Sequence, residues 1–338
     1  MSKLSIIIPV YFNADTLLDC YKELKEEVFE QIASYELILV DDGSEDDSWE
    51  VCKQIASMDK NTKLIKLSRN YGSHAACYAG IVAATGACAT IKTADCQEPP
   101  SLILGMYKSW EAGNKVVLGV REDREESFFQ VVFAKLYYKL VRKFVSDKMP
   151  KSGFDCYLID RKVIEALKHL DERNSAITLQ ILWVGFKTAT VTYKRLARKK
   201  GVSRWTLSKK VKLVLDSFVT FSHKPIRLVE YLGMIFACIS FLWGITLIVL
   251  RLIGLIHVDG WTTLSVIILF SSGMIMASLG VLGEYIWRTL DVAQNRPVYF
   301  IEEEFEQGSF PHCTKAGVDL EDTAVNMEKE SMDEDTSK

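Results

Sequence analysis

The sequence predicts an α/β fold, in which a mostly parallel sheet carries helices on both faces and is followed by a helical hairpin in the membrane. Two observations lead to this prediction. Short apolar runs alternate with amphipathic stretches through the first 120 residues, which is the rhythm of parallel strands joined by crossover helices. Residues 228–256 and 261–287 are then almost wholly apolar, and each stretch is long enough to cross a hydrocarbon layer of roughly 30 Å.

The strands and helices of the first part follow from the period of the apolar residues. Strands are expected at residues 4–9, 36–40, 63–67, 87–92 and 115–120. Helices are expected at residues 16–33, 45–57, 72–85 and 101–112. Together with the segment up to residue 205, these elements form a predicted catalytic domain.

Polar side chains follow each of the first four predicted strands. The candidate residues at these strand ends, which include one proline and one glycine, are Pro9, Tyr11 and Asn13 at the first, Asp41 and Asp42 at the second, Arg69, Asn70 and Gly72 at the third, and Asp95 and Gln97 at the fourth. Any one set is also compatible with a turn or a helix cap. Four sets in succession at the carboxyl ends of parallel strands, where such sheets bind ligands, favour a binding site.

Residues 127–146 form a different kind of predicted helix, with a wide apolar and aromatic face and a narrow stripe of Lys and Arg. A core helix can have this pattern, but aromatic residues flanked by lysines suit the headgroup boundary of a membrane, and we favour that interpretation. Residues 206–226 repeat the pattern more weakly and are predicted to be a juxtamembrane helix.

Charge sets the expected orientation of the hairpin. The segment 187–227 holds twelve Lys and Arg residues against one acid, so it should stay cytoplasmic. A multi-pass protein of the inner (cytoplasmic) membrane, with the catalytic domain and both termini in the cytoplasm, is therefore expected. No signal peptide is expected before the first strand. Residues 291–338 are predicted to be an acidic cytoplasmic tail, disordered from about residue 302.

Overall composition restricts the class of protein less than local charge does. The net charge of −3 averages a basic juxtamembrane segment and an acidic tail, and no nucleic-acid partner is expected. The eight cysteines contain no C-x-x-C pair, which indicates reduced, mostly buried thiols and argues against a zinc site.

The motifs at the strand ends resemble a known family. They are the run from Ile6 to Tyr11, Val40-Asp-Asp-Gly-Ser44, Ser68-Arg-Asn-Tyr-Gly72 and Ala94-Asp-Cys-Gln-Glu-Pro-Pro100. In this order they resemble the family 2 glycosyltransferases, which have a GT-A fold. With the two apolar stretches, residues 4–301 resemble the polyprenyl-phosphate glycosyltransferases, a group that includes dolichol-phosphate mannose synthase and the bactoprenol glucosyl transferases.

The resemblance implies an inverting transfer of one sugar from a UDP- or GDP-sugar to a polyprenyl phosphate such as undecaprenyl phosphate, for modification of cell-envelope glycans. Assembly into a homo-oligomer is a further option. Asp41 and Asp42 suit hydrogen bonds from the base and the ribose, and Arg69 suits the diphosphate. Asp155 lies in a segment that resembles the family's Asp-Phe-Arg-Leu-x-Asp-Arg run, and is a candidate for sugar contact or for a base-like role. Its alternative is a surface acid at the start of a strand.

The same resemblance implies a divalent cation, Mg²⁺ or Mn²⁺, beside the leaving diphosphate. The family's Asp-Ala-Asp-Leu-Gln-Asp run reads Thr93-Ala-Asp-Cys-Gln-Glu98 here, so the first acid is missing. Asp95 and Gln97 remain as predicted ligands. Either they hold the ion together with substrate oxygens, which we favour, or the enzyme depends mainly on basic residues.

An anionic lipid head requires cations close to the membrane. The residues predicted to bind the donor diphosphate and the lipid phosphate are Arg121, Arg124, Arg195, Arg198, Ser203 and Arg204. The alternative is that these charges only set the orientation in the membrane.

Two other functions remain open on the sequence. A processive polysaccharide synthase would carry a Gln-x-x-Arg-Trp motif, and Gly201-Val-Ser-Arg204-Trp205 has glycine in the glutamine position. A catalytically impaired scaffold that binds lipid is the second alternative, made plausible by Thr93, Glu98 and Tyr157.

Overall fold

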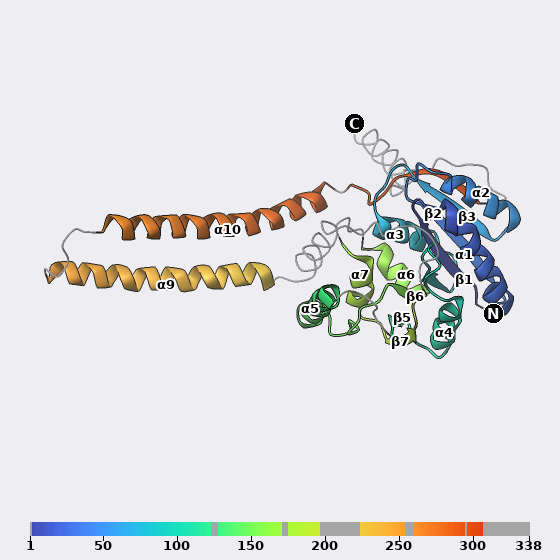
Figure 1. The fold of residues 1–338 in the computed structure, drawn as a ribbon, viewed down its shortest axis with the longest axis horizontal. Coiled ribbons are helices and arrows are strands. Elements are labelled where there is room, and N and C mark those ends of the chain that lie inside the picture. Colours follow the sequence, from blue (N-terminus) through green and yellow to red (C-terminus); the bar gives the residue numbers. More distant parts are fainter. Residues whose placement is uncertain are drawn as a thin grey trace, which may run out of the picture.

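The computed structural model describes residues 2–122, 128–170, 175–196, 224–253, 260–294 and 296–306 of the 338-residue chain. An α/β domain carries a long helical hairpin on one side (Figure 1). The predicted α/β class is therefore confirmed.

All the strands and helices predicted for the first 120 residues are present. The strands are β1 Leu4–Val10, β2 Tyr35–Asp41, β3 Thr62–Leu67, β4 Cys88–Ile91 and β5 Val116–Arg121. The helices are α1 Ala14–Glu27, α2 Ser48–Met58, α3 Ser73–Ala83 and α4 Pro100–Glu111, with a short 3₁₀ turn at Phe29–Gln31. In α1, for example, Leu17, Tyr21 and Leu24 are buried at helical spacing, so one face of the helix packs on the sheet.

The rest of the chain contains the helices predicted at 127–146, 228–256 and 261–287, together with elements that were not predicted. They are α5 Phe128–Phe144, β6 Cys156–Asp160, α6 Arg161–Lys168, α7 Ile177–Trp183, β7 Thr188–Tyr193, α9 Lys224–Leu252, α10 Trp261–Ala293 and β8 Ile301–Glu306.

The eight strands form one mixed sheet in the order β7-β5-β6-β4-β1-β2-β3-β8. Strands β1 to β4 are parallel, as predicted, whereas β6 runs antiparallel to both β4 and β5. Because β6 is antiparallel to β5, it begins at the edge of the sheet where β5 ends. The sheet is therefore less uniformly parallel than predicted.

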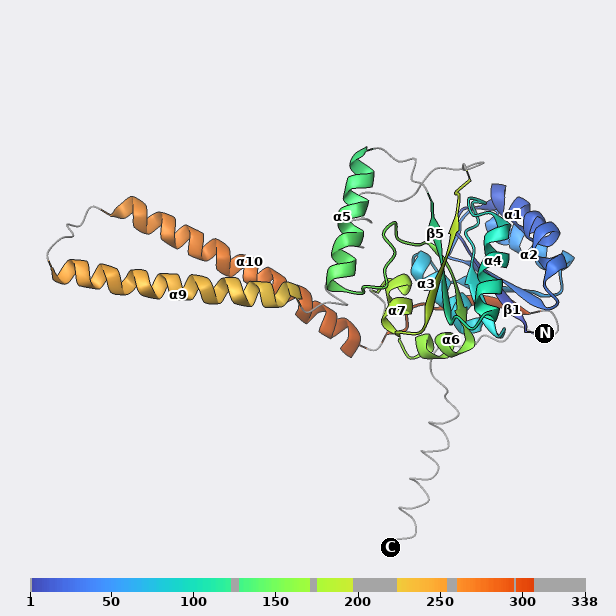
Figure 2. The ribbon, with the colours of Figure 1, turned by 90° about the horizontal axis from the view of Figure 1, so that it is seen from below.

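The sheet has an apolar core on each face, and helices cover both faces (Figure 2). Helices α1, α2 and α4 contribute to one core, and α3, α6 and α7 contribute to the other. Helix α3 comes so close to β1 that a Cβ atom at Gly80 would lie 2.3 Å from Ile7 Cγ2. Only glycine fits this approach.

Helices α9 and α10 lie side by side and extend away from the sheet, as both views show (Figures 1 and 2). The rings of Phe236 and Phe270 meet between them, with centroids 5.4 Å apart. Within the described ranges, no helix is both long and apolar enough to qualify as a membrane span. The predicted spans at 228–256 and 261–287 stay a prediction.

Strand β8 brings the chain back from the hairpin to the sheet, where it pairs antiparallel with β3. Glu304 forms an ion pair with Lys63 at 2.7 Å, and Glu302 forms one with Lys66 at 3.1 Å. The predicted disorder from residue 302 is therefore wrong for 302–306. The acidic residues that suggested a solvated tail instead match the basic side chains of a sheet edge.

Candidate active site

One edge of the sheet brings the predicted site residues together. The carboxyl ends of β1 to β4 lie there because these strands are parallel. The start of β6 lies at the same edge because Thr90 of β4 pairs with Leu158 of the antiparallel β6. The ends of β5 and β7 also lie there, since β5 runs opposite to β6 and parallel to β7.

The loops after β1 and β2 are joined by hydrogen bonds. The backbone N–H of Phe12 donates to Ser44 Oγ at 3.1 Å, and that of Asn13 donates to Ser48 Oγ at 2.8 Å. The side chain of Asn13 accepts a bond from the backbone N–H of Tyr11 at 3.0 Å. Tyr11 and Asn13 are therefore held in place, and Pro9 sits half-buried in the strand before them.

Asp42 organises the loop after β3. Its two carboxylate oxygens accept the backbone N–H groups of Tyr71 at 2.7 Å and Gly72 at 2.9 Å. Gly43 beside it has φ +67°, and a Cβ atom there would lie 2.5 Å from the backbone carbon of Arg69. The sequence Asp-Gly is thus required where the two loops touch, and Asp42 has a structural role in addition to its predicted one.

Asp41 differs from its neighbour because one of its oxygens is unused. Oδ2 accepts the backbone N–H of Ser44 at 3.1 Å, whereas Oδ1 is buried and has no hydrogen-bond partner within the described chain. Burial raises the pKa of Asp41, although the bonds from Ser44 oppose this. Of the two acids, Asp41 is therefore the one with a buried carboxylate oxygen that has no partner in the described chain.

The loop after β3 presents Arg69 and Asn70 to solvent. The Arg69 guanidinium lies over the ring of Tyr71, 4.2 Å from its centroid, which holds the cation at the edge of the site. Gly72 has φ +97° and precedes the first turn of α3.

The loop after β4 contains two buried charged residues, Lys92 and Glu98. Lys92 is 1% exposed, and its ammonium donates to the backbone oxygen of Glu98 at 2.7 Å. The Thr93 hydroxyl lies 2.6 Å from Asp95 Oδ1 and also against Glu98 Oε2. Burial raises the pKa of Glu98, and the charge of Asp95 raises it further. The Thr93 hydroxyl has one proton, so it can donate to only one of these two carboxylates at a time.

Lys92 and Glu98 are the residues of this loop that sequence reasoning left without a role. The position of Lys92 at the end of a buried apolar run could have indicated its role, because a lysine is almost never fully buried without a partner.

Two arginines predicted to bind phosphate are paired with predicted catalytic and metal-binding residues. Arg121, at the end of β5, forms an ion pair with Asp155, just before β6. Arg195, just after β7, donates to Gln97 Oε1, and the adjacent Leu196 N–H donates to the Gln97 backbone oxygen at 2.9 Å. Asp155 therefore neutralises Arg121, whereas Arg195 is held by a hydrogen bond to the uncharged amide of Gln97. Arg124, Arg198, Ser203 and Arg204 lie outside the described residues.

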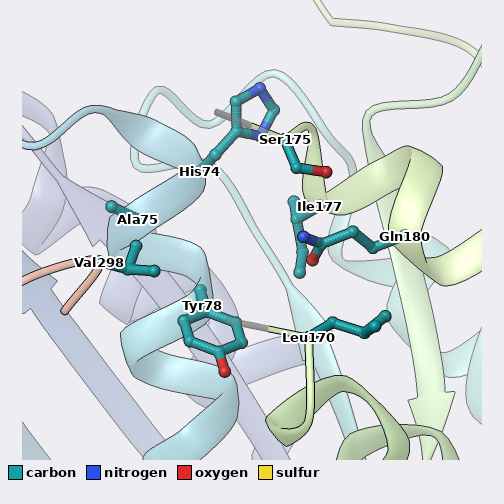
Figure 3. Close-up of a pocket in the computed structure, with 8 residues that line it drawn as sticks. All are labelled: His74, Ala75, Tyr78, Leu170, Ser175, Ile177, Gln180 and Val298. Carbon is teal, nitrogen blue, oxygen red and sulfur yellow. The ribbon is translucent and has the colours of Figure 1, made fainter. Parts of the chain in front are cut away.

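A separate small pocket lies between α3 and α7 and has an empty volume of about 250 Å³ (Figure 3). It is lined by His74, Ala75, Tyr78, Leu170, Ser175, Ile177, Gln180 and Val298. Ser175 Oγ is buried there without a hydrogen-bond partner in the described chain. None of the predicted site residues lines this pocket.

The chain belongs to glycosyltransferase family 2, and the family resemblance of its motifs is confirmed. The sequence model of the family Glycosyl transferase family 2 matches residues 5–168. The glycosyltransferase YkcC of Bacillus subtilis (strain 168) is 37% identical over 302 residues, which cover 89% of this chain and 94% of the relative. The chain is thus an enzyme of the glycosyltransferase class.

One further relative and one solved structure are also similar to this chain. The bactoprenol glucosyl transferase of Shigella phage SfV is 33% identical over 305 residues, which cover 89% of this chain and 99% of the relative. Among solved structures, glucosyl-3-phosphoglycerate synthase from Mycobacterium tuberculosis, in complex with Mn²⁺, UDP and its product, has a TM-score of 0.47 and 16% identity, covering 65% of this chain and 78% of that one.

Proposed function

We propose that this enzyme transfers one sugar from a UDP- or GDP-sugar to a polyprenyl phosphate such as undecaprenyl phosphate, with inversion at the anomeric carbon. The observation that carries the proposal is the match to a bactoprenol glucosyl transferase along 99% of that relative. It is supported by the charged edge of the sheet, where carboxylates for a nucleoside and arginines for phosphate lie together.

The donor would bind across the loops after β1, β2 and β3. Asp41 Oδ1 is the unused acceptor for an N–H or O–H of the nucleoside. Asp42 maintains the loop that carries Arg69 and Asn70, and the Arg69 guanidinium meets the diphosphate. These loops cover the base, ribose and diphosphate in that order.

The acceptor reduces what the reaction demands of the protein. A lipid phosphate is already anionic, so its oxygen can attack the anomeric carbon without giving up a proton to a base. The new carbon–oxygen bond forms as the bond to the diphosphate breaks, and the electron pair leaves with the diphosphate. Positioning and charge stabilisation therefore dominate, and Asp155 orients the sugar while arginines meet the phosphates.

The residues of the loop after β4 fit a divalent cation that is held largely by substrate oxygens. Asp95 supplies a carboxylate, and the Glu98 carboxyl lies on the other side of the Thr93 hydroxyl. No group of three or more His, Cys, Asp or Glu side chains suited to a metal occurs in the described residues. Asp95, joined by Gln97 if Arg195 moves, would hold Mg²⁺ or Mn²⁺. When bound, the ion offsets the charge of the leaving diphosphate.

Removal of divalent metal tests this assignment. We expect excess EDTA to abolish sugar transfer, and addition of Mg²⁺ or Mn²⁺ beyond the chelator to restore it. Full turnover in excess chelator would contradict the metal site and would favour an enzyme that depends on Lys92 and its arginines.

The hairpin is proposed to anchor the enzyme in the cytoplasmic membrane, with the catalytic domain on the cytoplasmic side. Large apolar side chains of α9 and α10 are exposed, among them Leu242, Trp243, Met276 and Ile286. Exposed apolar surface of this extent requires lipid or another protein to cover it. Helix α5 is proposed to lie at the headgroup boundary, and the hairpin also offers contacts for a homo-oligomer.

A panel of donors tests the function. The purified full-length enzyme is incubated with UDP- and GDP-sugars and undecaprenyl phosphate, and the lipid product is read by mass spectrometry. One sugar per lipid with one donor is the expected result. A ladder of sugars would indicate a processive synthase instead, and neither transfer nor donor hydrolysis with any donor would indicate a scaffold.

A further inference from the structure

Two buried polar atoms at the edge of the site make no hydrogen bond within the described chain: Arg121 Nε and Tyr193 Oη. They belong to neighbouring strands, because Arg121 of β5 and Tyr193 of β7 are partners in the sheet register. Tyr193 is 5% exposed. A buried polar group without a hydrogen bond costs free energy. Two such groups on neighbouring strands point to a second state of the protein in which both are hydrogen-bonded.

The environment of Tyr193 belongs to the active site. Burial raises the pKa of its phenol, and the nearby charges of Cys156 and Glu98 raise it further, while Arg121 opposes the shift. The phenol is therefore protonated at neutral pH. The Tyr193 hydroxyl and the Arg121 guanidinium are close enough to shift each other's pKa, but neither Tyr193 Oη nor Arg121 Nε completes a hydrogen bond within the described chain.

Arg121 itself is committed elsewhere in this structure. One of its terminal nitrogens, Nη2, forms the ion pair with Asp155, whose carboxylate is nearly half exposed. An anion that enters the site with several oxygens competes with this single carboxylate for the guanidinium. A small rotation of Arg121 away from Asp155 would bring Nε toward the Tyr193 hydroxyl.

We propose that Tyr193 is a positioning residue for Arg121. When a phosphate group replaces Asp155 as the partner of Arg121, Nε donates to Tyr193 Oη, and the terminal nitrogens of the guanidinium face the phosphate. One new hydrogen bond then satisfies both unpaired atoms, and Asp155 is released toward the sugar. This inference rests on the proposed function, because that function supplies the phosphate and gives Asp155 its role.

The phosphate can come from either substrate. The donor brings a diphosphate and the lipid acceptor brings a monophosphate, and both present oxygens to a guanidinium fork. Inorganic pyrophosphate and inorganic phosphate are therefore suitable probes for the two sources.

The test compares Tyr193→Phe with a matched control, Tyr157→Phe, in the full-length protein in detergent. Tyr157 is also a buried tyrosine whose hydroxyl has no partner in the described chain, on the neighbouring β6. Isothermal titration measures the Kd of pyrophosphate and of phosphate, and thermal unfolding confirms that each variant is folded. We expect Tyr193→Phe to weaken binding of one or both anions by about 10- to 100-fold, the usual value of a hydrogen bond to a charged group.

The pattern across anions and variants decides the outcome. Weaker binding of pyrophosphate alone assigns the donor diphosphate, and weaker binding of phosphate alone assigns the acceptor. If Arg121→Ala is already present, Tyr193→Phe should add little further loss. An unchanged Kd for both anions, an equal loss in Tyr157→Phe, or additive losses with Arg121→Ala would each overturn the proposal, as would wild-type protein that binds neither anion.

Kinetics separates this inference from the function on which it rests. Tyr193→Phe should raise the KM of the substrate whose phosphate is bound, or lower kcat, with the KM of the other substrate unchanged. If wild-type enzyme transfers sugar and Tyr193→Phe matches it in every constant, the role of Tyr193 is refuted and the function stands. If wild-type protein transfers no sugar but shows the expected binding pattern, the function fails and the pairing of Arg121 with Tyr193 stands.

Discussion

Two arginines at the carboxyl edge of the sheet already have side-chain partners before any substrate arrives. Arg121 with Asp155 and Arg195 with Gln97 each join a predicted phosphate ligand to a predicted catalytic or metal-binding residue. Such pairs keep the charges from standing alone in a partly buried site. Under the proposed function, a phosphate that binds Arg121 would displace Asp155 from it, so the affinity for phosphate would be tied to the release of Asp155.

Replacement of Asp155 with Asn tests its role in the reaction. The change keeps the shape and removes the charge that orients the sugar, so we expect kcat to fall roughly 10²- to 10³-fold, with little loss of stability because the side chain is nearly half exposed. Glu165→Gln, an exposed ion-paired acid of α6, is the control and should retain full activity. A D155N enzyme with wild-type kcat would leave Asp155 as a surface acid at the start of a strand.

Glu36 is a residue whose role is stability. Burial disfavours its charge, but hydrogen bonds from Lys3, Ser5 and Thr85 outweigh this and lower its pKa to about 2, from 4.5. Because the folded pKa is depressed, the stabilisation is complete above pH 4.5 and is lost as the pH falls from there toward 2. We expect Glu36→Gln to lower the free energy of unfolding by about 3 kcal/mol at pH 7.

Thermal unfolding of the wild type and the E36Q variant between pH 7 and pH 3 checks this expectation. The difference between them should shrink as the pH falls below 4.5. Glu50→Gln, which removes an exposed acid paired with Lys53, should show no such trend. A difference that does not change with pH would mean that the charge of Glu36 contributes nothing.

At the level of elements, β8 joins the end of the hairpin to the catalytic sheet. It covers the outer edge of β3 and brings acidic residues opposite lysines of that strand. Trp49 of α2 also donates to Glu303 at 3.3 Å. The segment that follows the hairpin is thus attached to the catalytic sheet through backbone pairing and side-chain contacts.

A charge exchange tests the contribution of the ion pairs to this attachment. Lys63→Glu places like charges opposite each other and should destabilise the protein by about 1 kcal/mol, because both partners are partly buried. Adding Glu304→Lys should restore most of the loss. If the double variant is no more stable than Lys63→Glu alone, the backbone hydrogen bonds between β3 and β8 hold β8 without help from this ion pair. Unfolding midpoints of the three proteins in detergent provide the measurement.

At the scale of the whole molecule, the enzyme combines a charged active site with an apolar hairpin. The two substrates that we propose require this combination, since one is soluble in water and the other is confined to a bilayer. Helices α9 and α10 extend from the domain on one side, so lipid around them would place the domain at the membrane surface (Figure 2).

The association with membranes is testable in the full-length protein. The double variant Ile239→Lys and Leu242→Lys puts two charges on exposed apolar positions of α9. Each costs roughly 2.5–3.5 kcal/mol near the centre of a span, so alkaline carbonate should extract the variant from membranes while wild type stays in the pellet. Met58→Lys, an exposed apolar position on α2, should behave as wild type. Equal retention of all three proteins would contradict a hairpin within lipid.

Much of the fold followed from the sequence by itself, because the features concerned are local. The alternation of apolar runs predicted β1 to β5 and α1 to α4, and the polar residues at strand ends predicted the edge that carries the site. Strand β7 and the pairing of β8 with β3 were not predicted. Residues 302–306 were predicted to belong to a solvated tail because they are acidic. Their partner strand lies more than 230 residues earlier in the chain, and pairing at that distance leaves no local pattern in the sequence.

Only the tertiary structure decided which side chains of the site meet. The sequence determined that four residues carry suitable chemistry: Arg121, Asp155, Gln97 and Arg195. They lie on four separate segments, and their pairing depends on the antiparallel direction of β6 in the sheet. The same holds for Tyr193, which reads in the sequence as an ordinary strand residue. Its place beside Arg121 comes from the register of β7 on β5, and distances across a sheet are set by packing.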